Sequence, residues 1–511
     1  MDEKANLPFV LASTLPSLGL VLHDCDCACA LDLPSVLAAG SAFALHDCDC
    51  ACAVDAPFAS AARSTPARWM KRSEAWPIPL AGGWQAYFNP LGPVGVTALN
   101  AQARQVLAAF EPPIPLRAAA TRVPELPPRA VARAARSLAG VGLLHPVVEP
   151  AVPPARTATL SAWLHITESC NLDCPYCYVD KRRTAMSVEV GRRAVDRLIE
   201  MAVRHGYAAL KLKYAGGEPT LHFPLVRAVH AHATRRVAET GLVLQEVLLT
   251  NGVGVTAAML NFVAQAGMQL MVSLDGGPTA HDRIRASRDG RSTHSVVTDT
   301  VEQALARGVR STISITLAAP TLAGAGEAVA FALARALPFS LNFYRDCRLA
   351  EWEPSPLVPD PDQLVGALLR IFDQIRTVST YPLPLTGILD RTRLDLPHRH
   401  ACSAGRDYLV VSTRGQVSAC QMLLAEPWAD LADEDPLAAV RHRGESVFGA
   451  PAGDSACDHC HWRAACGGGC PLVRTTPLHD HYCQVYRILL PELVRLEAGR
   501  LIALHSAGVA H

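Results

Sequence analysis

The sequence of 511 residues lacks several features that would place it in common classes of binding protein. It has no excess of charge, because 47 Lys and Arg residues balance 47 Asp and Glu residues, so no net field favours nucleic acid or an anionic membrane surface. It has no uninterrupted apolar run of about 18 residues, the length that crosses a bilayer. Residues 1–4 lack the cationic flank of a secretory signal. We therefore expect a cytoplasmic protein of roughly three domains with neither a nucleic-acid nor a membrane partner.

The N-terminal region has no Lys or Arg between residues 5 and 62. Within it the sequence HDCDCACA occurs at residues 23–30 and again at 46–53, and a Leu-Pro-Ser precedes each copy. Two short copies are too few to stack as a repeat domain. We expect residues 1–66 to form a flexible tail with two cassettes, whose cysteines are Cys25, Cys27, Cys29, Cys48, Cys50 and Cys52.

Cysteine content and hydrophobic pattern divide the rest of the chain. Because the cytosol is reducing, the 17 cysteines favour metal ligation or redox chemistry over a disulfide framework. The expected parts are a small domain over residues 75–148, a stiff linker at 148–156, an α/β domain over 158–350, a connecting helical segment over 351–397, and a cysteine-rich region with a C-terminal helix over 398–511.

The small domain has the pattern of a winged helix. Residues 84–99 carry the Asn-Pro and Gly-Pro punctuation of a hairpin, and residues 101–110 and 129–144 have helical periodicity. The α/β domain alternates strands and helices, and its expected strands are 164–167, 209–214, 243–249, 269–274, 311–317 and 340–344. Six β/α units predict a parallel, barrel-like sheet with its chemistry on loops at the carboxyl ends of the strands.

Three cysteines directly follow the first expected strand with the spacing Cys170-x3-Cys174-x2-Cys177. Three thiolates on one loop suit a [4Fe-4S] cluster in which one iron has no protein ligand, and this open iron is what catalysis requires. The alternative is a structural zinc site that lacks its fourth ligand.

With Tyr176 and the sequence Gly216-Gly217-Glu218-Pro219 after the second strand, the triplet resembles the radical S-adenosylmethionine (radical SAM) family over roughly residues 160–345. The resemblance implies a partial (β/α)6 barrel and S-adenosylmethionine bound at the open iron, from which a hydrogen-abstracting 5′-deoxyadenosyl radical forms. It also implies that the loop at 216–219 binds the methionine ammonium and that Ser273 binds the ribose. The implied cofactor contacts are Tyr176, Gly216, Gly217, Glu218, Pro219, Thr250, Asn251, Ser273 and Asp275.

Seven further cysteines resemble the SPASM extension of enzymes that mature peptides and proteins: Cys402, Cys420, Cys457, Cys460, Cys466, Cys470 and Cys483. The resemblance implies two auxiliary [4Fe-4S] clusters, one held by Cys457, Cys460, Cys466 and Cys483 and the other by Cys402, Cys420 and Cys470. His398, His400, Cys347 or a substrate thiolate are the candidates for the missing fourth ligand. Zinc knuckles are the alternative for residues 457–470.

The segment 82–144 resembles the PqqD-like element that binds the leader of a ribosomally made peptide, which implies a sheet edge where a peptide adds a strand. Beside such a domain, the cysteine-rich tail suggests a precursor-like substrate carried by the enzyme itself, with residues 7–22 as a leader. The alternatives are a metal-binding tail, because Asp flanks the thiols, and a wrongly assigned start site.

The sequence therefore predicts a radical SAM peptide maturase that forms thioether links from Cys sulfur to carbon. The resemblance implies an electron donor such as flavodoxin or ferredoxin. One alternative is the oxidation of a Ser or Cys side chain in a protein, as in sulfatase-maturing relatives, with Tyr344 or Asp346 as base or radical relay. An alternative of another class is a non-catalytic iron-sulfur electron carrier.

Overall fold

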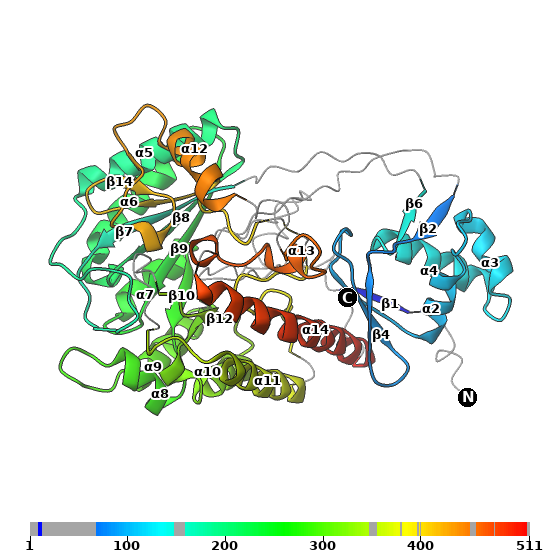
Figure 1. Ribbon diagram of the computed structural model, residues 1–511. Coiled ribbons are helices and arrows are strands. Elements are labelled where there is room, and N and C mark those ends of the chain that lie inside the picture. The colour runs from blue at the N-terminus through cyan, green and yellow to red at the C-terminus, as the bar shows by residue number, and fades with distance from the viewer. Residues whose placement is uncertain are drawn as a thin grey trace.

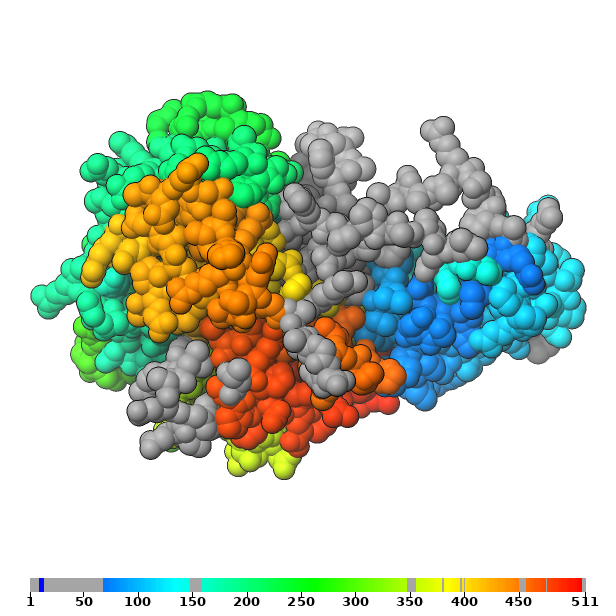
Figure 2. All heavy atoms as spheres, turned by 45° about the horizontal axis from the view of Figure 1, so that its top comes forward, coloured from blue at the N-terminus to red at the C-terminus, as the bar shows by residue number. Residues whose placement is uncertain are grey.

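The structure is a computed structural model that describes residues 9–12, 68–147, 159–346, 355–378, 381–395, 398, 400–449, 456–474 and 476–507. A large α/β body and a smaller N-terminal body lie side by side, and helix α14 (Pro477–Ser506) runs from one to the other (Figure 1). In the space-filling view the light-orange segments lie against the large body, and the red and deep-orange segments reach the blue N-terminal body (Figure 2). The two cassettes and Cys347 lie outside the described residues.

The large body is built on six parallel strands that neighbour one another in chain order, which confirms the expected parallel sheet. The strands are β7 (Thr159–Thr167), β8 (Ala209–Gly216), β9 (Val243–Thr250), β10 (Gln269–Ser273), β11 (Thr312–Leu317) and β12 (Phe339–Phe343). The helices between them are α5 (Val188–Arg204), α6 (Phe223–Ala238), α7 (Ala257–Gln265), α8 (Pro278–Arg285), α9 (His294–Leu305) and α10 (Ala325–Ala334).

Helix α5 illustrates why these segments become helices. The Ser187 side chain accepts a hydrogen bond from the Val190 amide and so caps the helix. Ala194, Leu198 and Met201 recur at helical spacing and are buried, so one face of α5 packs on the sheet.

The sheet continues beyond the barrel, which differs from the sequence analysis. Strand β13 (Tyr408–Val411) pairs in parallel with β7, and β14 (Gln416–Ser418) and β15 (Ala429–Asp430) extend it to nine strands. The expectation for this region was little regular structure, organised by metal. The four apolar residues of β13 are too few to produce a periodic signal, and their partner lies far away in the chain.

The N-terminal body holds an antiparallel sheet of β3 (Trp76–Pro79), β4 (Gln85–Phe88) and β5 (Val96–Leu99), a second ribbon of β2 (Trp69–Lys71) and β6 (Leu144–Pro146), and the helices α2 (Ala101–Ala108), α3 (Ala119–Arg122) and α4 (Pro128–Gly140). The β4–β5 hairpin was predicted, as were α2 and α4. The body starts at β2, earlier than residue 75, because β2 pairs with β6 and closes the body.

The N-terminal body packs directly on the C-terminal region. Strands β3, β4 and β5 contact α14, and the Trp76 ring stacks on the His461 ring with centroids 3.6 Å apart. The Gly95 amide donates to the Asp395 carbonyl at 2.9 Å, and a side chain at Gly95 would collide with the Leu394 carbonyl.

Strand β1 (Val10–Ala12) departs from the expected flexible tail. It pairs antiparallel with β5, so the sheet order is β1-β5-β4-β3. Three residues are too few for a sequence pattern to predict this strand, and its partner is almost 90 residues away.

The remaining described helices join the sheet to the C-terminal region. Helix α11 (Pro361–Thr377) packs along α14, and α12 (Pro436–Phe448) and α13 (Arg463–Cys466) precede it. Across the described ranges, no helix combines the length and the apolar composition that a bilayer crossing requires.

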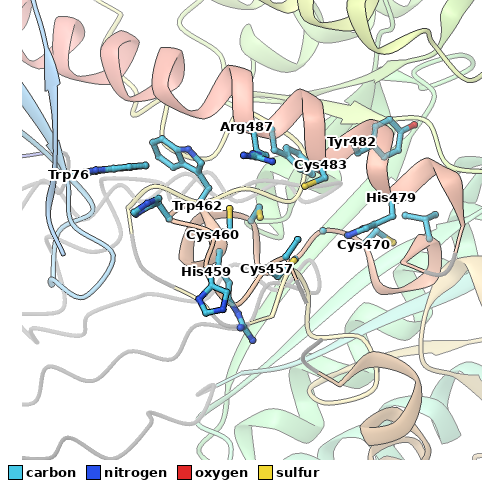
Figure 3. Close-up of a pocket in the computed structure, with 18 residues that line it drawn as sticks. Trp76, Cys457, His459, Cys460, Trp462, Cys470, His479, Tyr482, Cys483 and Arg487 are labelled. Carbon is cyan, nitrogen blue, oxygen red and sulfur yellow. The ribbon is translucent and has the colours of Figure 1, made fainter. Parts of the chain in front are cut away.

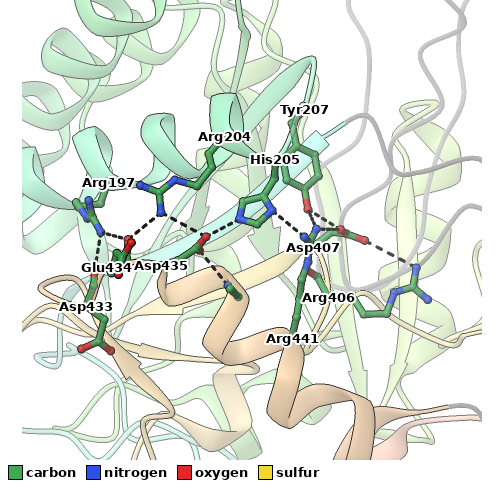
Figure 4. A network of polar contacts seen from close by, with 11 residues as sticks. Arg197, Arg204, His205, Tyr207, Arg406, Asp407, Asp433, Glu434, Asp435 and Arg441 are labelled. Atoms are coloured by element: carbon green, nitrogen blue, oxygen red, sulfur yellow. Dashed lines mark hydrogen bonds and ion pairs between the residues drawn. The ribbon is translucent and has the colours of Figure 1, made fainter.

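A polar network binds α12 to the barrel (Figure 4). The Tyr207 hydroxyl donates to the Asp407 carboxylate at 2.5 Å, and the Arg441 guanidinium donates to the same oxygen at 3.0 Å. Arg441 also donates to His205, whose other ring nitrogen lies 2.9 Å from the Asp435 carboxylate. The pKa of Asp435 is lowered, because hydrogen bonds from the Ala438 amide and His205 outweigh the opposing effect of burial.

We expect Asp407→Ala to lower the thermal stability of the protein. The substitution leaves the buried Tyr207 hydroxyl and Arg441 without their shared acceptor, a loss of about 1–3 kcal/mol. The midpoint Tm in differential scanning fluorimetry should fall by several degrees, since about 1 kcal/mol shifts Tm by roughly 2–4 °C in a domain of 150–250 residues. The control is Asp299→Ala, because Asp299 is exposed on α9. Equal Tm values for the two variants would contradict the role given to this network.

Candidate active site and auxiliary metal sites

A cavity of about 240 Å³ opens at the carboxyl ends of the barrel strands. Gly216 ends β8, Thr250 ends β9 and Ser273 ends β10, and all of them line it. The thiols that line it are Cys170, Cys174 and Cys177 from the loop after β7 and Cys402, Cys420 and Cys470 from the C-terminal region. The triplet and the expected three-cysteine auxiliary set therefore share one cavity.

The loop after β8 lies against the backbone of the loop after β7. The Gly217 amide donates to the Thr167 carbonyl at 2.7 Å, and the Glu218 amide donates to the Ser169 carbonyl at 2.8 Å. A Cβ atom at Gly216 or Gly217 would lie 2.2 Å from a carbonyl oxygen of that loop, and Gly216 has a φ of +139°. Both positions therefore require glycine.

The Glu218 carboxylate is buried and holds the neighbouring loops together. One oxygen accepts from the Thr220 amide at 3.1 Å and from the Thr250 hydroxyl at 2.8 Å, and the other accepts from the Asn251 amide at 2.8 Å. Burial raises the pKa of Glu218 although these hydrogen bonds act to lower it. Glu218 also lines the cavity, while both of its carboxylate oxygens accept hydrogen bonds from the loops.

Asn251 and Ser273, two of the expected cofactor contacts, both line the cavity. The Asn251 side-chain amide donates to the Asn171 side chain at 2.7 Å and lies 3.7 Å from the Cys170 sulfur. Ser273 is partly exposed and lines the cavity, as does Pro219. Asn171 was missed in the sequence, because its role depends on a loop that is 80 residues away.

Asp275 does not line the cavity, in contrast to its expected role as a cofactor contact. Its carboxylate accepts hydrogen bonds from the Tyr176 hydroxyl, from the Arg285 guanidinium at 2.6 Å and from the Thr316 amide at 2.7 Å. Asp275 is fully buried, so it fixes Tyr176 and Arg285, which do line the cavity. Arg285 was also missed, because nothing in its local sequence signals this partner.

Burial disfavours the thiolate form of four of the cavity thiols. Burial raises the pKa of Cys174 to about 11 and also raises the pKa values of Cys170, Cys402 and Cys420. A thiolate ligand in such surroundings is stabilised by the positive charge of the metal that it binds. Each described cysteine is a free thiol and is therefore available as a ligand.

A second cavity, of about 450 Å³, lies beside α14 (Figure 3). Cys457, Cys460 and Cys466 line it from the loop around α13, and Cys483 lines it from α14. These are the cysteines expected to hold the other auxiliary cluster. His459 and His461 lie beside them and are exposed.

Cys470 lines both cavities and follows three glycines with positive φ, Gly467, Gly468 and Gly469. A Cβ atom at Gly467 would lie 2.2 Å from the Ala401 amide nitrogen. The glycines let this loop turn tightly against residues 400–401, so Cys470 reaches the wall between the cavities.

The three cysteine groups fit iron-sulfur clusters by the chemistry of their donors. Soft thiolates are the ligands that such clusters take, and the members of each group line the same cavity. Among the described residues, no three His, Cys, Asp or Glu side chains converge on a single metal ion. A cluster binds each thiolate at a different iron, so its ligands lie further apart than those of one ion.

Neither of the two described candidates for a fourth ligand lines a cavity with the Cys402, Cys420 and Cys470 group. His398 and His400 line neither cavity, and Cys347 lies outside the described residues. Arg391 and Gln421 line the cavity beside these thiols instead. Tyr344 also lines it, whereas Asp346 does not.

Comparison with known proteins finds a family similarity in the barrel region. Residues 164–321 match the model of the Radical SAM superfamily, so this part of the chain is similar to that family. PqqA peptide cyclase of Rhizobium meliloti is 32% identical over 127 residues, 24% of this chain and 32% of that protein. PqqA peptide cyclase of Xanthomonas axonopodis pv. citri is 33% identical over 161 residues, 31% of this chain and 40% of that protein. The match thus spans well under half the length of these curated relatives.

The fold also resembles a solved structure described as native anSMEcpe with bound AdoMet. The TM-score is 0.56 at 17% identity, over 66% of this chain and 99% of that one. The structural similarity indicates a shared fold, and at this sequence identity it indicates no more than the fold. The shared part extends beyond the region that matches the family model.

We expect Gly217→Ala to abolish cleavage of S-adenosylmethionine while the protein still folds. The new methyl group would lie 2.2 Å from the Ser169 carbonyl and push apart the two loops that line the cavity. The measurement is 5′-deoxyadenosine release by the anaerobically reconstituted protein with dithionite, together with circular dichroism. The control is Gly140→Ala at the end of α4, where an added Cβ meets nothing within 4 Å. Unchanged release by Gly217→Ala would refute the close-packing argument.

Proposed function

We propose that this protein modifies a peptide by radical chemistry and joins cysteine sulfur to carbon in thioether links. The observation that carries the proposal is the shared cavity, which is lined by the Cys170, Cys174 and Cys177 triplet and by Cys402, Cys420 and Cys470. A site for generating a radical and a site for accepting an electron then face the same substrate. The relatives named PqqA peptide cyclase support a peptide substrate.

The triplet would hold the catalytic [4Fe-4S] cluster, and the loops at 216–219 and 250–251 would hold S-adenosylmethionine. When bound and reduced, this pair supplies a 5′-deoxyadenosyl radical that removes a hydrogen atom from the substrate. The protein's part is to bind and orient. Glu218 places a carboxylate by the cofactor space, and Asp275 fixes Tyr176 and Arg285 at its wall.

The auxiliary thiols would hold the electron acceptor that thioether formation requires. Joining a thiol sulfur to a carbon radical releases one electron, and the group of Cys402, Cys420 and Cys470 would hold its acceptor. Cys470 lies in the wall toward the second cavity, where Cys457, Cys460, Cys466 and Cys483 would hold a further cluster. Two auxiliary clusters then provide a path away from the substrate, and an external donor such as flavodoxin or ferredoxin supplies the reducing electron.

A second candidate is the oxidation of a Ser or Cys side chain in a protein. Tyr344 lines the cavity, where it would serve as base or radical relay, and one structure of the same fold is described as anSMEcpe with AdoMet and the Cp18Cys peptide. This reaction also removes two hydrogens but leaves no sulfur-to-carbon link. A non-catalytic electron carrier is the third candidate and would not cleave S-adenosylmethionine.

Two cysteine variants should distinguish cleavage of S-adenosylmethionine from the function of the auxiliary cluster. We expect Cys174→Ala to lose 5′-deoxyadenosine release entirely, because the catalytic cluster would lose one of its three thiolate ligands. We expect Cys402→Ala to retain release at a reduced rate but to form no thioether, because the product radical has no electron acceptor. Iron content and electron paramagnetic resonance of both proteins check that only the intended cluster is lost.

Each alternative predicts a distinct result in the same experiment. Intact clusters without 5′-deoxyadenosine release would refute the proposal and favour the electron carrier. Release with a peptide that has lost two hydrogens from a serine and keeps its alkylatable thiols, or that has lost a cysteine thiol without gaining a cross-link, would favour side-chain oxidation.

A further inference from the structure

Strand β1 fills the outer edge of the N-terminal sheet. Val10 lies opposite Leu99, and Leu11 lies opposite Ala98, in antiparallel register. In the described sheet, β5 would be the edge strand without β1. Addition of an extended segment to a sheet edge is a general mode of peptide recognition, and here the added strand belongs to the same chain.

The contacts of β1 are made by specific side chains on both faces. Leu11 is 7% exposed and belongs to the main hydrophobic core, whereas Val10 packs against the core of the N-terminal body. The Phe9 amide donates to the Asn100 side chain at 3.0 Å, and the Phe9 ring lies 4.6 Å from the His505 ring of α14. The segment is thus bound between the N-terminal sheet and the C-terminal helix.

We propose that residues 9–12 are a recognition segment docked in cis, and that the six cysteines of the two cassettes are substrates of the chain's own active site. The inference rests on the proposed function and names its substrate. Residues 13–67, which follow β1, carry both cassettes and lie outside the described residues.

The length of helix α14 gives the distance between the docked strand β1 and the cavity, which the cassettes must span. Phe9 contacts His505 near its end, and Tyr482 near its start donates a hydrogen bond to the Tyr344 carbonyl beside the catalytic cavity. At 1.5 Å per residue these points are about 35 Å apart. Cys25 is 13 residues beyond Ala12, which extends to about 45 Å. The first cassette can therefore reach the cavity while β1 stays docked.

Charge does not oppose entry of the cassettes. Residues 5–62 carry no Lys or Arg, and Asp flanks the cassette thiols. Lys181, Arg285 and Arg345 line the cavity, and each is paired with an aspartate outside the lining. Glu218 is the carboxylate of the lining, and its oxygens accept hydrogen bonds from the loops. The wall therefore presents no excess negative charge that would repel an acidic peptide.

The proposed step balances for each link. The S–H bond of a cassette cysteine and a C–H bond of an acceptor residue break, and one C–S bond forms. The hydrogen atom from carbon leaves in 5′-deoxyadenosine, the thiol proton passes to solvent, and one electron passes to an auxiliary cluster. Each link consumes one S-adenosylmethionine and one donor electron and removes two hydrogens from the peptide.

Docking can be tested in cluster-free protein, independently of activity. We expect the amides of Phe9 and Leu11, which point toward Asn100 and β5, to be protected from hydrogen-deuterium exchange, and Leu11→Asp to abolish that protection because it would bury a charge in the core. The control is Leu91→Asp, since Leu91 is 49% exposed on the same body. Unprotected amides in the parent protein would overturn the docking.

Modification can be tested on one tryptic peptide, residues 5–63, which holds all six cassette cysteines. After anaerobic expression with cluster-assembly factors, we expect it to lose two hydrogens per link and to resist alkylation, except in Cys174→Ala. Leu11→Asp should lower the modified fraction about tenfold, the effect of losing roughly 1.4 kcal/mol of docking free energy, while cofactor cleavage persists. Cleavage of the cofactor with six alkylated thiols would overturn the inference alone, whereas absence of cleavage would overturn the proposed function with it.

Modification in cis can be distinguished from modification in trans by mixing two chains. A ¹⁵N-labelled Cys174→Ala chain is incubated with unlabelled parent protein during reconstitution, and both 5–63 peptides are weighed. We expect links only in the unlabelled peptide. Equal modification of the labelled peptide would overturn the cis assignment.

Discussion

The site depends on the close contact between two backbone loops at the carboxyl ends of β7 and β8. The Gly217 and Glu218 amides bind the carbonyls of Thr167 and Ser169, and the cysteine triplet begins at the next residue. Glu218 then binds Thr250 and Asn251 after β9. The ends of three strands thus form one rim of the cavity. The loop that carries the thiols lies so close to Gly216 and Gly217 that only glycine fits at these two positions.

The six barrel strands were predictable from the sequence because their signals are local. Apolar runs such as 243–249 and 269–274 end at turn residues, and the helices between them have apolar faces with identifiable caps. The grouping of the C-terminal cysteines was predictable only through resemblance to a family. Their spacing alone leaves the pairing between clusters open.

Long-range contacts account for what the sequence could not predict. Asp275 appeared to be a cofactor contact because it ends a strand, but its carboxylate turns to Tyr176 and Arg285. Strand β13 has four residues and pairs with β7 almost 250 positions earlier. The same holds for the meeting of Cys402 and Cys420 with the triplet, since no local pattern reports which distant loops enclose one space.

The pairing of β13 with β7 also bears on how this protein can be divided. All nine residues of β7 are buried, and β13 covers the side of β7 that faces away from β8. A barrel cut off before residue 398 would present this apolar strand as a bare edge, a surface that promotes aggregation. The C-terminal region is therefore a structural part of the barrel rather than a separable module.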